Sequence, residues 1–176
     1  MTVNKGTLYV LATPIGNLKD ITVRAIETLQ ESDLVVAENR ERALKLLSHL
    51  QIHKPIVNIN SYNEERKAQS IAQEVRAGKQ CVLISGAGTP CISDPGDAVV
   101  RKCHEMGLDV KALPGPSAVI TALSISGLSP DRFFFYGFLP QKKGKRRKMT
   151  KSQETWRNRD LGDIEHQLHA RNAGGL

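Results

Sequence analysis

Short apolar runs alternate five times with segments of helical periodicity, and this alternation constrains the fold more than any other feature. Strands are predicted at residues 7–12, 34–37, 56–59, 80–85 and 109–113. Helices are predicted at about residues 22–31, 41–50, 64–77, 97–106 and 117–125. Parallel strands need a crossover segment between them, so this order is typical of a parallel sheet. We expect an α/β fold with an open, mainly parallel sheet and helices on both faces.

Loops rich in proline and glycine follow three of the predicted strands. They are TPIGN at 13–17, SGAGTPCISDPG at 85–96 and LPGPSA at 113–118. Ligand sites of open α/β sheets lie at the carboxyl ends of the strands. Glycine lets a ligand approach the backbone closely, and proline fixes the shape of a loop. We expect the three loops to form one cleft, although each could also be only a tight turn.

The motifs argue against several kinds of site. Gly86 and Gly88 lack a third glycine at the dinucleotide spacing, and no P-loop lysine motif occurs. No histidine pair or cysteine spacing fits a metal, so the three cysteines are expected to be free thiols. The loops suit instead a nucleoside with a zwitterionic tail, because N–H groups at a helix start can meet a carboxylate. Ala87, Ile92 and Leu123 could enclose an adenine.

Positive charge is concentrated near the end of the chain. Residues 1–140 carry 15 Lys and Arg against 14 Asp and Glu, whereas residues 141–176 carry 10 against 4. The run KKGKRRK at 142–148 could attract a phosphate backbone, or it could be a solvated, disordered segment. No apolar stretch is long enough to span a bilayer, and the first residues lack a signal-peptide pattern. We therefore expect a cytoplasmic protein without membrane contacts.

The pattern changes after Gly127. FFFYGFL at 133–139 is predicted as an isolated aromatic strand, the first strand of an incomplete second domain. An unpaired strand of this kind needs a partner, so a homodimer is one possibility. The expected organisation is an α/β domain at 1–127, the start of a second domain with the basic segment at 128–148, and a divergent, poorly ordered tail at 149–176.

Four segments of the chain resemble the bacterial 16S rRNA ribose 2'-O-methyltransferase family: LYVLATPIGNLKDITVRAIETL, LISGAGTPCISDPG, LPGPSAVITALSISGL and DRFFFYGFLPQKKGKRRK. This family belongs to the tetrapyrrole-methylase-like class of S-adenosylmethionine enzymes. The resemblance runs from about Gly6 to Lys148 and corresponds to the N-terminal half of the family, as in a truncated member. It implies a cleft between two α/β domains that holds S-adenosylmethionine. It also implies a cytidine ribose of 16S rRNA in the small ribosomal subunit as the target.

The resemblance also implies roles for individual residues. Those expected around the methyl donor are Pro14, Ser85, Gly86, Ala87, Thr89, Pro114, Ser117 and Leu123. Those expected against RNA are Lys142, Lys143, Lys145, Arg146, Arg147 and Lys148. The reaction would be an in-line displacement without a metal, assisted by a general base. Glu38, at a strand end, is the first candidate for that base and Asp94 the second. Either carboxylate could instead be a helix cap or a surface group.

The chain departs from the family pattern at several positions. The usual EDTR reads Glu38, Asn39, Arg40 and Glu41, and the aspartate of SDAGTP is replaced by Gly86. Beyond Lys148 the resemblance stops. Two other functions therefore stay open: a truncated or degenerate homologue without catalytic activity, and a small-molecule methylase of the tetrapyrrole type. The basic segment argues against the latter, because RNA is the more fitting polyanion.

Overall fold

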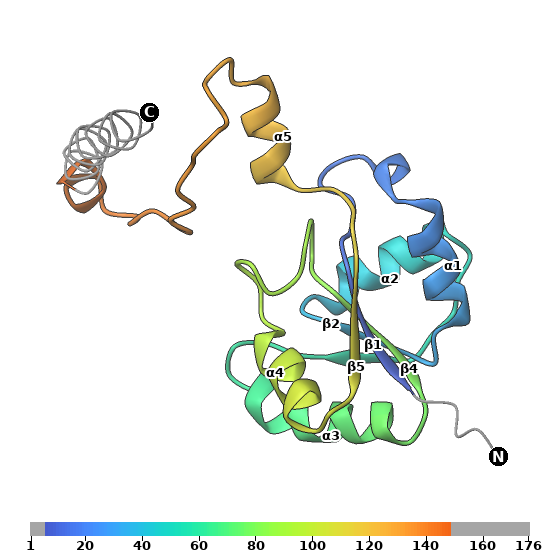
Figure 1. Ribbon diagram of the computed structural model, residues 1–176. Coiled ribbons are helices and arrows are strands. Elements are labelled where there is room, and N and C mark those ends of the chain that lie inside the picture. The colour runs from blue at the N-terminus through green and yellow to red at the C-terminus, as the bar shows by residue number, and fades with distance from the viewer. Residues whose placement is uncertain (1–5, 149–176) are drawn as a thin grey trace, which may run out of the picture. The chain divides into compact units, whose positions relative to one another are not determined.

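The computed structural model describes residues 6–148, and the chain divides into two units, Met1–Phe133 and Phe134–Leu176 (Figure 1). The first unit contains a five-stranded parallel sheet with the strand order β3-β2-β4-β1-β5. The strands are β1 (Thr7–Leu11), β2 (Leu34–Ala37), β3 (Ile56–Asn58), β4 (Gln80–Ile84) and β5 (Asp109–Leu113). The helices are α1 (Val23–Glu31), α2 (Arg40–His49), α3 (Glu64–Arg76), α4 (Asp97–Glu105) and α5 (Ala118–Ile125). The predicted α/β fold is confirmed, and the ten strands and helices predicted up to residue 125 lie within one residue of their expected bounds.

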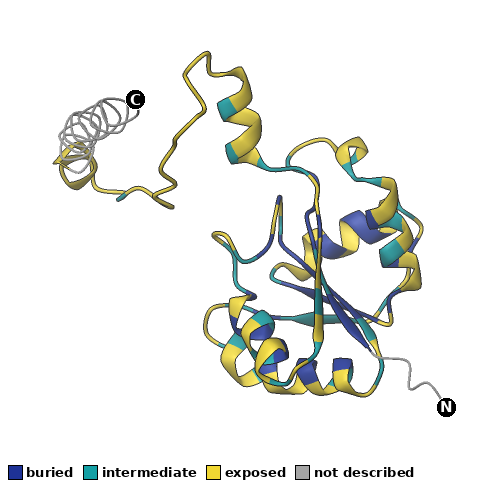
Figure 2. Cartoon of the chain, in the orientation of Figure 1, coloured by how far each residue is buried: buried dark blue, intermediate teal, exposed yellow. Residues whose placement is uncertain are grey.

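The hydrophobic core has two layers, one on each face of the sheet. Along β4, Cys81 and Leu83 point to the layer formed with α3 and α4, whereas Val82 and Ile84 point to the layer formed with α1 and α2. This alternation follows from the strand geometry, in which successive side chains point to opposite faces. Figure 2 shows the buried residues along the inner sides of these four helices. α5 has no buried residue.

Polar side chains determine where the helices begin. Thr22, Asn39 and Ser117 precede α1, α2 and α5, and their side-chain oxygens accept hydrogen bonds from backbone N–H groups of the first turn. Such caps satisfy donors that have no partner within the helix. A short 3-10 helix at Leu18–Asp20 was not predicted; the side chain of Asn17 accepts from the Lys19 N–H group and closes it.

The prediction of a strand at residues 133–139 is wrong. The structure assigns no strand there, because a strand requires a neighbouring strand and the described part of the second unit offers none. The aromatic side chains of this segment are exposed, with Phe134 at 80% and Phe138 at 83%. Residues 143–148 are helical. The predicted tail at 149–176 lies outside the described residues. Within residues 6–148, no helix has the length and apolar content needed to cross a membrane.

Candidate active site

The three loops rich in proline and glycine lie at the carboxyl ends of adjacent strands. They follow β4, β1 and β5, which are neighbours in the sheet (Figure 1). Because all strands are parallel, these ends share one edge of the sheet. The three loops therefore lie side by side at one edge of the sheet, while the cleft that they are expected to form stays a prediction.

Hydrogen bonds join the first loop to the second. The backbone groups of Thr13 and Gly88 exchange two hydrogen bonds, with N···O distances of 2.9 and 3.0 Å. The Thr13 hydroxyl donates to the Ser85 carbonyl (3.3 Å), and the Ser85 hydroxyl donates to the Gly88 carbonyl (2.9 Å). Both hydroxyl-bearing residues are buried. These hydrogen bonds therefore hold the first two loops together.

The third loop packs closely against the first two loops. A methyl group on Gly115 would lie 3.0 Å from the Ala12 Cβ, at the end of β1. A methyl group on Gly88 would lie 3.5 Å from a methyl carbon of Ile15 and 3.8 Å from the Pro116 carbonyl oxygen. Gly88 thus lies where the three loops meet, and its φ of +82° is one that glycine adopts readily.

The residues expected around a methyl donor fall into three groups. Pro14 and Ser85 are buried, and the Ser85 hydroxyl is used to close its own loop. Gly86, Ser117 and Leu123 are half-buried. Ala87, Thr89 and Pro114 are exposed at the loops. The exposed and half-buried residues are therefore the ones that a ligand at this edge could contact, whereas Pro14 and Ser85 shape the loops.

The two candidate bases, Glu38 and Asp94, lie close together, although they follow different strands. Burial raises the pKa of the Glu38 carboxyl, and the charge of Asp94 and a hydrogen bond with it raise this pKa further, whereas Arg42 lowers it. Neither carboxylate is a helix cap. Asn39 caps α2, because its side-chain oxygen accepts a hydrogen bond from the Arg42 backbone N–H group (3.0 Å). Gly96 holds the cap position of α4. Helix capping therefore does not account for either carboxylate.

Three further side chains support the carboxylate pair and were not predicted. Arg42 lies over Gly86, where a methyl group would be 3.0 Å from its guanidinium. The Asn58 amide donates to the Glu38 carbonyl, and the Glu64 carboxylate accepts from the Gly96 N–H group. The only sequence signal was a polar Asn at the end of a strand, where such residues are depleted.

Burial keeps the cysteine thiols protonated. It raises the pKa of Cys81 to about 12 and, with nearby carboxylates, that of Cys91 to about 11. Burial also raises the pKa of Cys103 to about 11. All three are free thiols, as predicted. A thiol with so high a pKa is a poor nucleophile at neutral pH, so covalent catalysis by cysteine is not supported. Among the described residues, no group of His, Cys, Asp and Glu could hold a metal ion.

The basic side chains expected to contact RNA belong to the second unit. The structure places all six in an exposed segment, of which residues 143–148 are helical. The Arg146 backbone N–H group donates to the Lys142 carbonyl (3.0 Å), which forms the first turn of this helix. A helical backbone distributes these side chains around its axis, so that a phosphate backbone could be contacted from more than one side.

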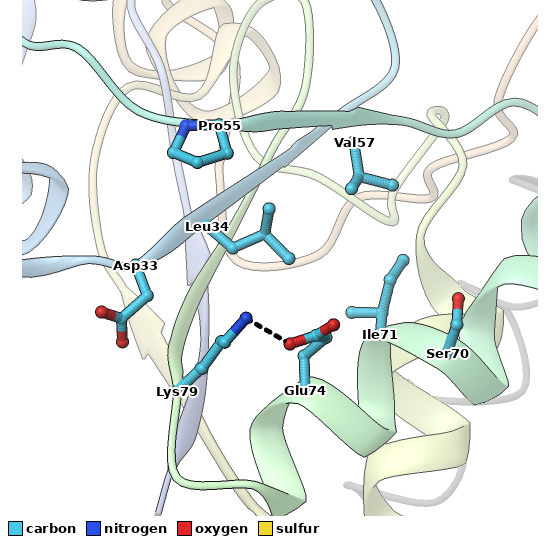
Figure 3. A pocket seen from close by; sticks show the side chains of 8 residues that line it. All are labelled: Asp33, Leu34, Pro55, Val57, Ser70, Ile71, Glu74 and Lys79. Carbon is cyan, nitrogen blue, oxygen red and sulfur yellow. Dashed lines mark ion pairs between the residues drawn. The ribbon is translucent and has the colours of Figure 1, made fainter.

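A cavity of about 170 Å³ lies at the opposite edge of the sheet (Figure 3). Its lining includes Asp33 before β2, Pro55 before β3 and Lys79 before β4. Lys79 forms an ion pair with Glu74 (2.5 Å) in its wall. None of the predicted site residues lines this cavity. Ligands of open α/β sheets bind at the carboxyl ends of strands, so the site stays assigned to the loops.

Comparison with known proteins gives a family and several relatives. The family model of the tetrapyrrole (corrin/porphyrin) methylases matches residues 7–164. "Ribosomal RNA small subunit methyltransferase I" of Haemophilus influenzae is 51% identical over 142 residues, which are 81% of this chain and 50% of that protein. The protein of the same name from Escherichia coli O157:H7 is 46% identical over 151 residues, which are 86% of this chain and 53% of that protein. The chain thus spans about half the length of these curated relatives.

Solved structures share the fold at low sequence identity. Diphthine synthase has a TM-score of 0.58 and 18% identity, over 73% of this chain and 51% of that one. Uroporphyrin III C-methyltransferase from Thermus thermophilus has a TM-score of 0.53 and 21% identity, over 68% of this chain and 52% of that one. At such identities these structures support the architecture alone.

Proposed function

The chain belongs to the tetrapyrrole (corrin/porphyrin) methylase family, and on this basis we propose that it acts as an S-adenosylmethionine-dependent methyltransferase on 16S rRNA. The proposed target is the 2'-hydroxyl of a cytidine ribose in the small ribosomal subunit, which would place the protein in the cytoplasm. The relatives named as small-subunit rRNA methyltransferases support this substrate. Because the chain spans about half their length, the activity of this chain is itself part of the proposal.

One observation carries the proposal: three loops from adjacent strands converge beside a pair of carboxylates. The loops after β4, β1 and β5 meet at Gly88, and Asp94 of the second loop lies close to Glu38. A methyl transfer to a hydroxyl needs both parts, a place for the donor and a base for the proton.

The residues present fit S-adenosylmethionine at the loops. Around the buried Gly88, the loops expose small groups at Ala87, Thr89 and Pro114. The start of α5 at Ala118 offers N–H groups to the carboxylate of such a ligand. When bound, the ligand supplies an electrophilic methyl group on a sulfonium. The proposed set also includes the half-buried Gly86, Ser117 and Leu123, which the ligand could contact. Pro14 and Ser85 belong to the set as buried residues that shape the loops.

Glu38 and Asp94 would take up the proton of the ribose hydroxyl. As the bond from ribose oxygen to the methyl carbon forms and the carbon–sulfur bond breaks, the hydroxyl proton passes to a carboxylate oxygen of this pair. Glu38 is the first candidate, because a carboxylate with a raised pKa is a stronger base once it is ionised. Arg42 lowers the pKa of Glu38 and so favours the ionised form of this carboxyl.

The basic segment would hold the rRNA. Six basic side chains supply a concentrated positive charge in a segment that is exposed throughout: Lys142, Lys143, Lys145, Arg146, Arg147 and Lys148. Contacts of this kind fix the position of a phosphate backbone without reading its sequence. The choice of one cytidine would then depend on the loops and on the folded shape of the rRNA.

Donor binding and methyl transfer test the proposal separately. The purified chain is titrated with S-adenosylmethionine and with its demethylated product in a calorimeter. It is then incubated with radiolabelled donor and small subunits that lack the modification, with fully modified subunits as the control. Saturable binding and transfer only to the unmodified subunits are expected. The site of transfer is identified as a ribose whose 3'-phosphodiester resists alkali. The absence of heat at millimolar donor would contradict the proposal.

A second candidate is a homologue that folds but does not catalyse. The share of about half of each relative's length favours it, since in the family a second domain is expected to complete the cleft. This candidate predicts a folded first unit with little affinity for the donor, and possible association through the exposed aromatic residues 133–139. Any turnover by the purified chain would eliminate it. A small-molecule methylase is the third candidate, and competition between rRNA fragments and porphyrinoids would distinguish it.

A further inference from the structure

We propose that the connection from β3 to α3, residues 58–64, holds the two carboxylates of the site together, with Asn58 and Glu64 as positioning residues. This inference rests on the proposed function for its catalytic meaning, because Glu38 and Asp94 are the proposed bases. Its structural part stands on hydrogen bonds between elements and can be tested without turnover.

Asn58 holds the backbone of Glu38. It ends β3, and its register partner on β2 is Ala37, the residue before Glu38. The Asn58 side-chain nitrogen donates to the Ala37 carbonyl (3.2 Å) and to the Glu38 carbonyl (2.5 Å). The Lys67 ammonium in turn donates to the Asn58 carbonyl. One carboxamide thus extends the pairing of the two strands by a residue and fixes the point from which the Glu38 side chain starts.

Glu64 holds the loop that carries Asp94. Its carboxylate oxygen accepts a hydrogen bond from the Gly96 N–H group (2.6 Å), two residues after Asp94. Gly96 is pressed against β4 on its other side, where a methyl group would lie 2.8 Å from a Leu83 methyl carbon. The end of the loop is therefore fixed between β4 and the start of α3.

The connection between the two positioning residues is itself rigid. The Asn60 N–H group donates to the Asn63 side chain (2.9 Å), and the Asn63 N–H group donates to the Asn60 side chain (3.0 Å). The Glu64 N–H group donates to the Asn60 carbonyl (2.9 Å). These reciprocal bonds join Asn60 to the start of α3, and the Lys67 ammonium joins the Asn58 carbonyl to the same helix. Asn58 bonds the Glu38 backbone and Glu64 bonds the loop of Asp94, so the connection holds the two carboxylates at a fixed distance from each other.

The pKa of Glu38 reports whether the carboxylates remain together. Two charged groups act on it: Asp94 from the loop after β4, which raises the pKa, and Arg42 from α2, which lowers it. If Asp94 moves away, the pKa of Glu38 falls toward its ordinary value. This shift distinguishes positioning from a general loss of stability, because a less stable but intact fold keeps the pair.

The test compares Glu64→Ala with Glu64→Gln in the full chain. Side-chain ¹³C-labelled glutamate gives the Glu38 titration, and amide exchange gives the protection of Gly96. Glu64→Ala is expected to lower the Glu38 pKa and to speed exchange at Gly96 by about tenfold or more, because a bond to a charged acceptor is lost. Glu64→Gln keeps an acceptor and is expected to stay close to the wild type.

Asp33→Ala is the matched control. The Asp33 carboxylate accepts from the Gln80 N–H group (2.8 Å), a bond of the same kind at the amino ends of the strands. It should speed exchange at Gln80 and leave the Glu38 titration unchanged. If Glu64→Ala changes neither readout, the proposal is overturned. It is also overturned if Glu64→Gln lowers the pKa as much as the alanine variant does, because charge alone would then explain the effect.

Asn58→Ala tests the other half of the connection. It is expected to lower the Glu38 pKa while exchange at Gly96 changes little, since Glu64 remains. A serine hydroxyl has a single hydrogen and cannot donate to both carbonyls, so Asn58→Ser replaces the alanine variant if that one does not fold. Asn17→Ala removes a similar side-chain bond outside the connection and should leave Glu38 unchanged. An unchanged Glu38 titration in both Asn58 variants would refute its role.

Turnover adds a readout that depends on the proposed function. If the chain transfers methyl groups, Glu64→Ala is expected to lower kcat and to leave KM for S-adenosylmethionine near its original value, because Glu64 bonds the second loop at Gly96, which is not among the residues proposed around the methyl donor. If the wild-type chain neither binds the donor nor transfers methyl groups, the proposed function fails. The titration and the exchange experiment then still decide whether the connection positions the carboxylates.

Discussion

At the scale of single residues, the site combines groups that do not favour folding by themselves. Glu38 and Asp94 lie together although two neighbouring carboxylates resist ionising at the same time. Glu38 is also partly withdrawn from water, which disfavours its charged form. A fold selected only for stability would place an amide at one of these positions. Carboxyls with perturbed pKa values are frequent at functional sites, which agrees with the proposed role of the pair.

Glu38→Gln is predicted to stabilise the protein at neutral pH. The folded pKa of Glu38 lies above its ordinary value of 4.5, so the folded state binds this proton more tightly than the unfolded state. The stabilisation from the protonated form is complete below pH 4.5 and is lost as the pH rises through the raised folded pKa. A neutral amide should remove that loss. Urea unfolding between pH 4 and 8 should show a flatter profile for the variant.

The control for this prediction is Glu27→Gln, which changes an exposed carboxylate on α1. It should leave the difference in stability between pH 4 and pH 8 as in the wild type. Methyl transfer should fall by about 10²-fold or more in Glu38→Gln if Glu38 is the base. A variant less stable than the wild type at pH 7 would argue against the proposed surroundings of Glu38.

Gly115→Ala is predicted to destabilise the protein by about 1 kcal/mol or more, because it overpacks a close contact. The added methyl group would lie 3.0 Å from the Ala12 Cβ and 3.2 Å from its carbonyl oxygen, and Ala12 is buried. The third loop would have to move away from β1. Gly16→Ala is the control, since nothing lies within 4 Å of its added methyl group. Equal unfolding midpoints for the two variants would contradict the close packing.

At the scale of elements, a buried hydroxyl adds to the backbone hydrogen bonds that hold the first two loops together. Thr13→Val keeps the shape of the side chain but removes its hydrogen bond to the Ser85 carbonyl. The expected cost is about 1–3 kcal/mol, because a buried carbonyl loses a donor. Thr28→Val removes an exposed hydroxyl bond to Arg24 within α1 and should cost within about 0.5 kcal/mol. Denaturant unfolding measures both. Thr13→Val should also weaken the binding of S-adenosylmethionine, because the proposed site is formed by these loops.

The elements themselves could be predicted from the sequence, because they depend on local signals. Thr22 and the apolar positions of α1 specify that helix, and the runs at 34–37 and 109–113 specify strands without reference to the rest of the chain. The convergence of the loops could also be predicted, since parallel strands place all their carboxyl ends at one edge. What remained open was the strand order that makes β4, β1 and β5 neighbours.

The supporting contacts of the site could not be predicted, because they join distant parts of the chain. The bond from Gly96 to Glu64 spans 32 residues, and that from Asn58 to Glu38 depends on the pairing of β2 with β3. A helix-start glutamate or a strand-end asparagine has many possible partners in a sequence. The strand predicted at 133–139 is wrong because only its local pattern supports it. Its local pattern is strand-like, but pairing is not a local property.

At the scale of the whole molecule, charge is divided unevenly between the two units. The body up to residue 140 is nearly balanced, with 15 basic and 14 acidic side chains, and the excess lies beyond it. A field localised in this way attracts a polyanion to one part of the chain. The proposed rRNA substrate therefore predicts that binding depends on salt through the segment 142–148 and not through the net charge.

The last prediction separates these two sources of affinity. Changing Lys142, Lys143, Lys145 and Lys148 to glutamine should reduce the slope of log K against log salt by about 3, since each lost phosphate contact contributes about 0.7–0.9. The matched control changes four exposed basic residues of the first unit, Lys19, Arg24, Lys45 and Lys111, to glutamine. It removes the same charge and should leave the slope nearly unchanged. If both variants lose affinity equally for an rRNA fragment, binding follows net charge and the basic segment has no special role.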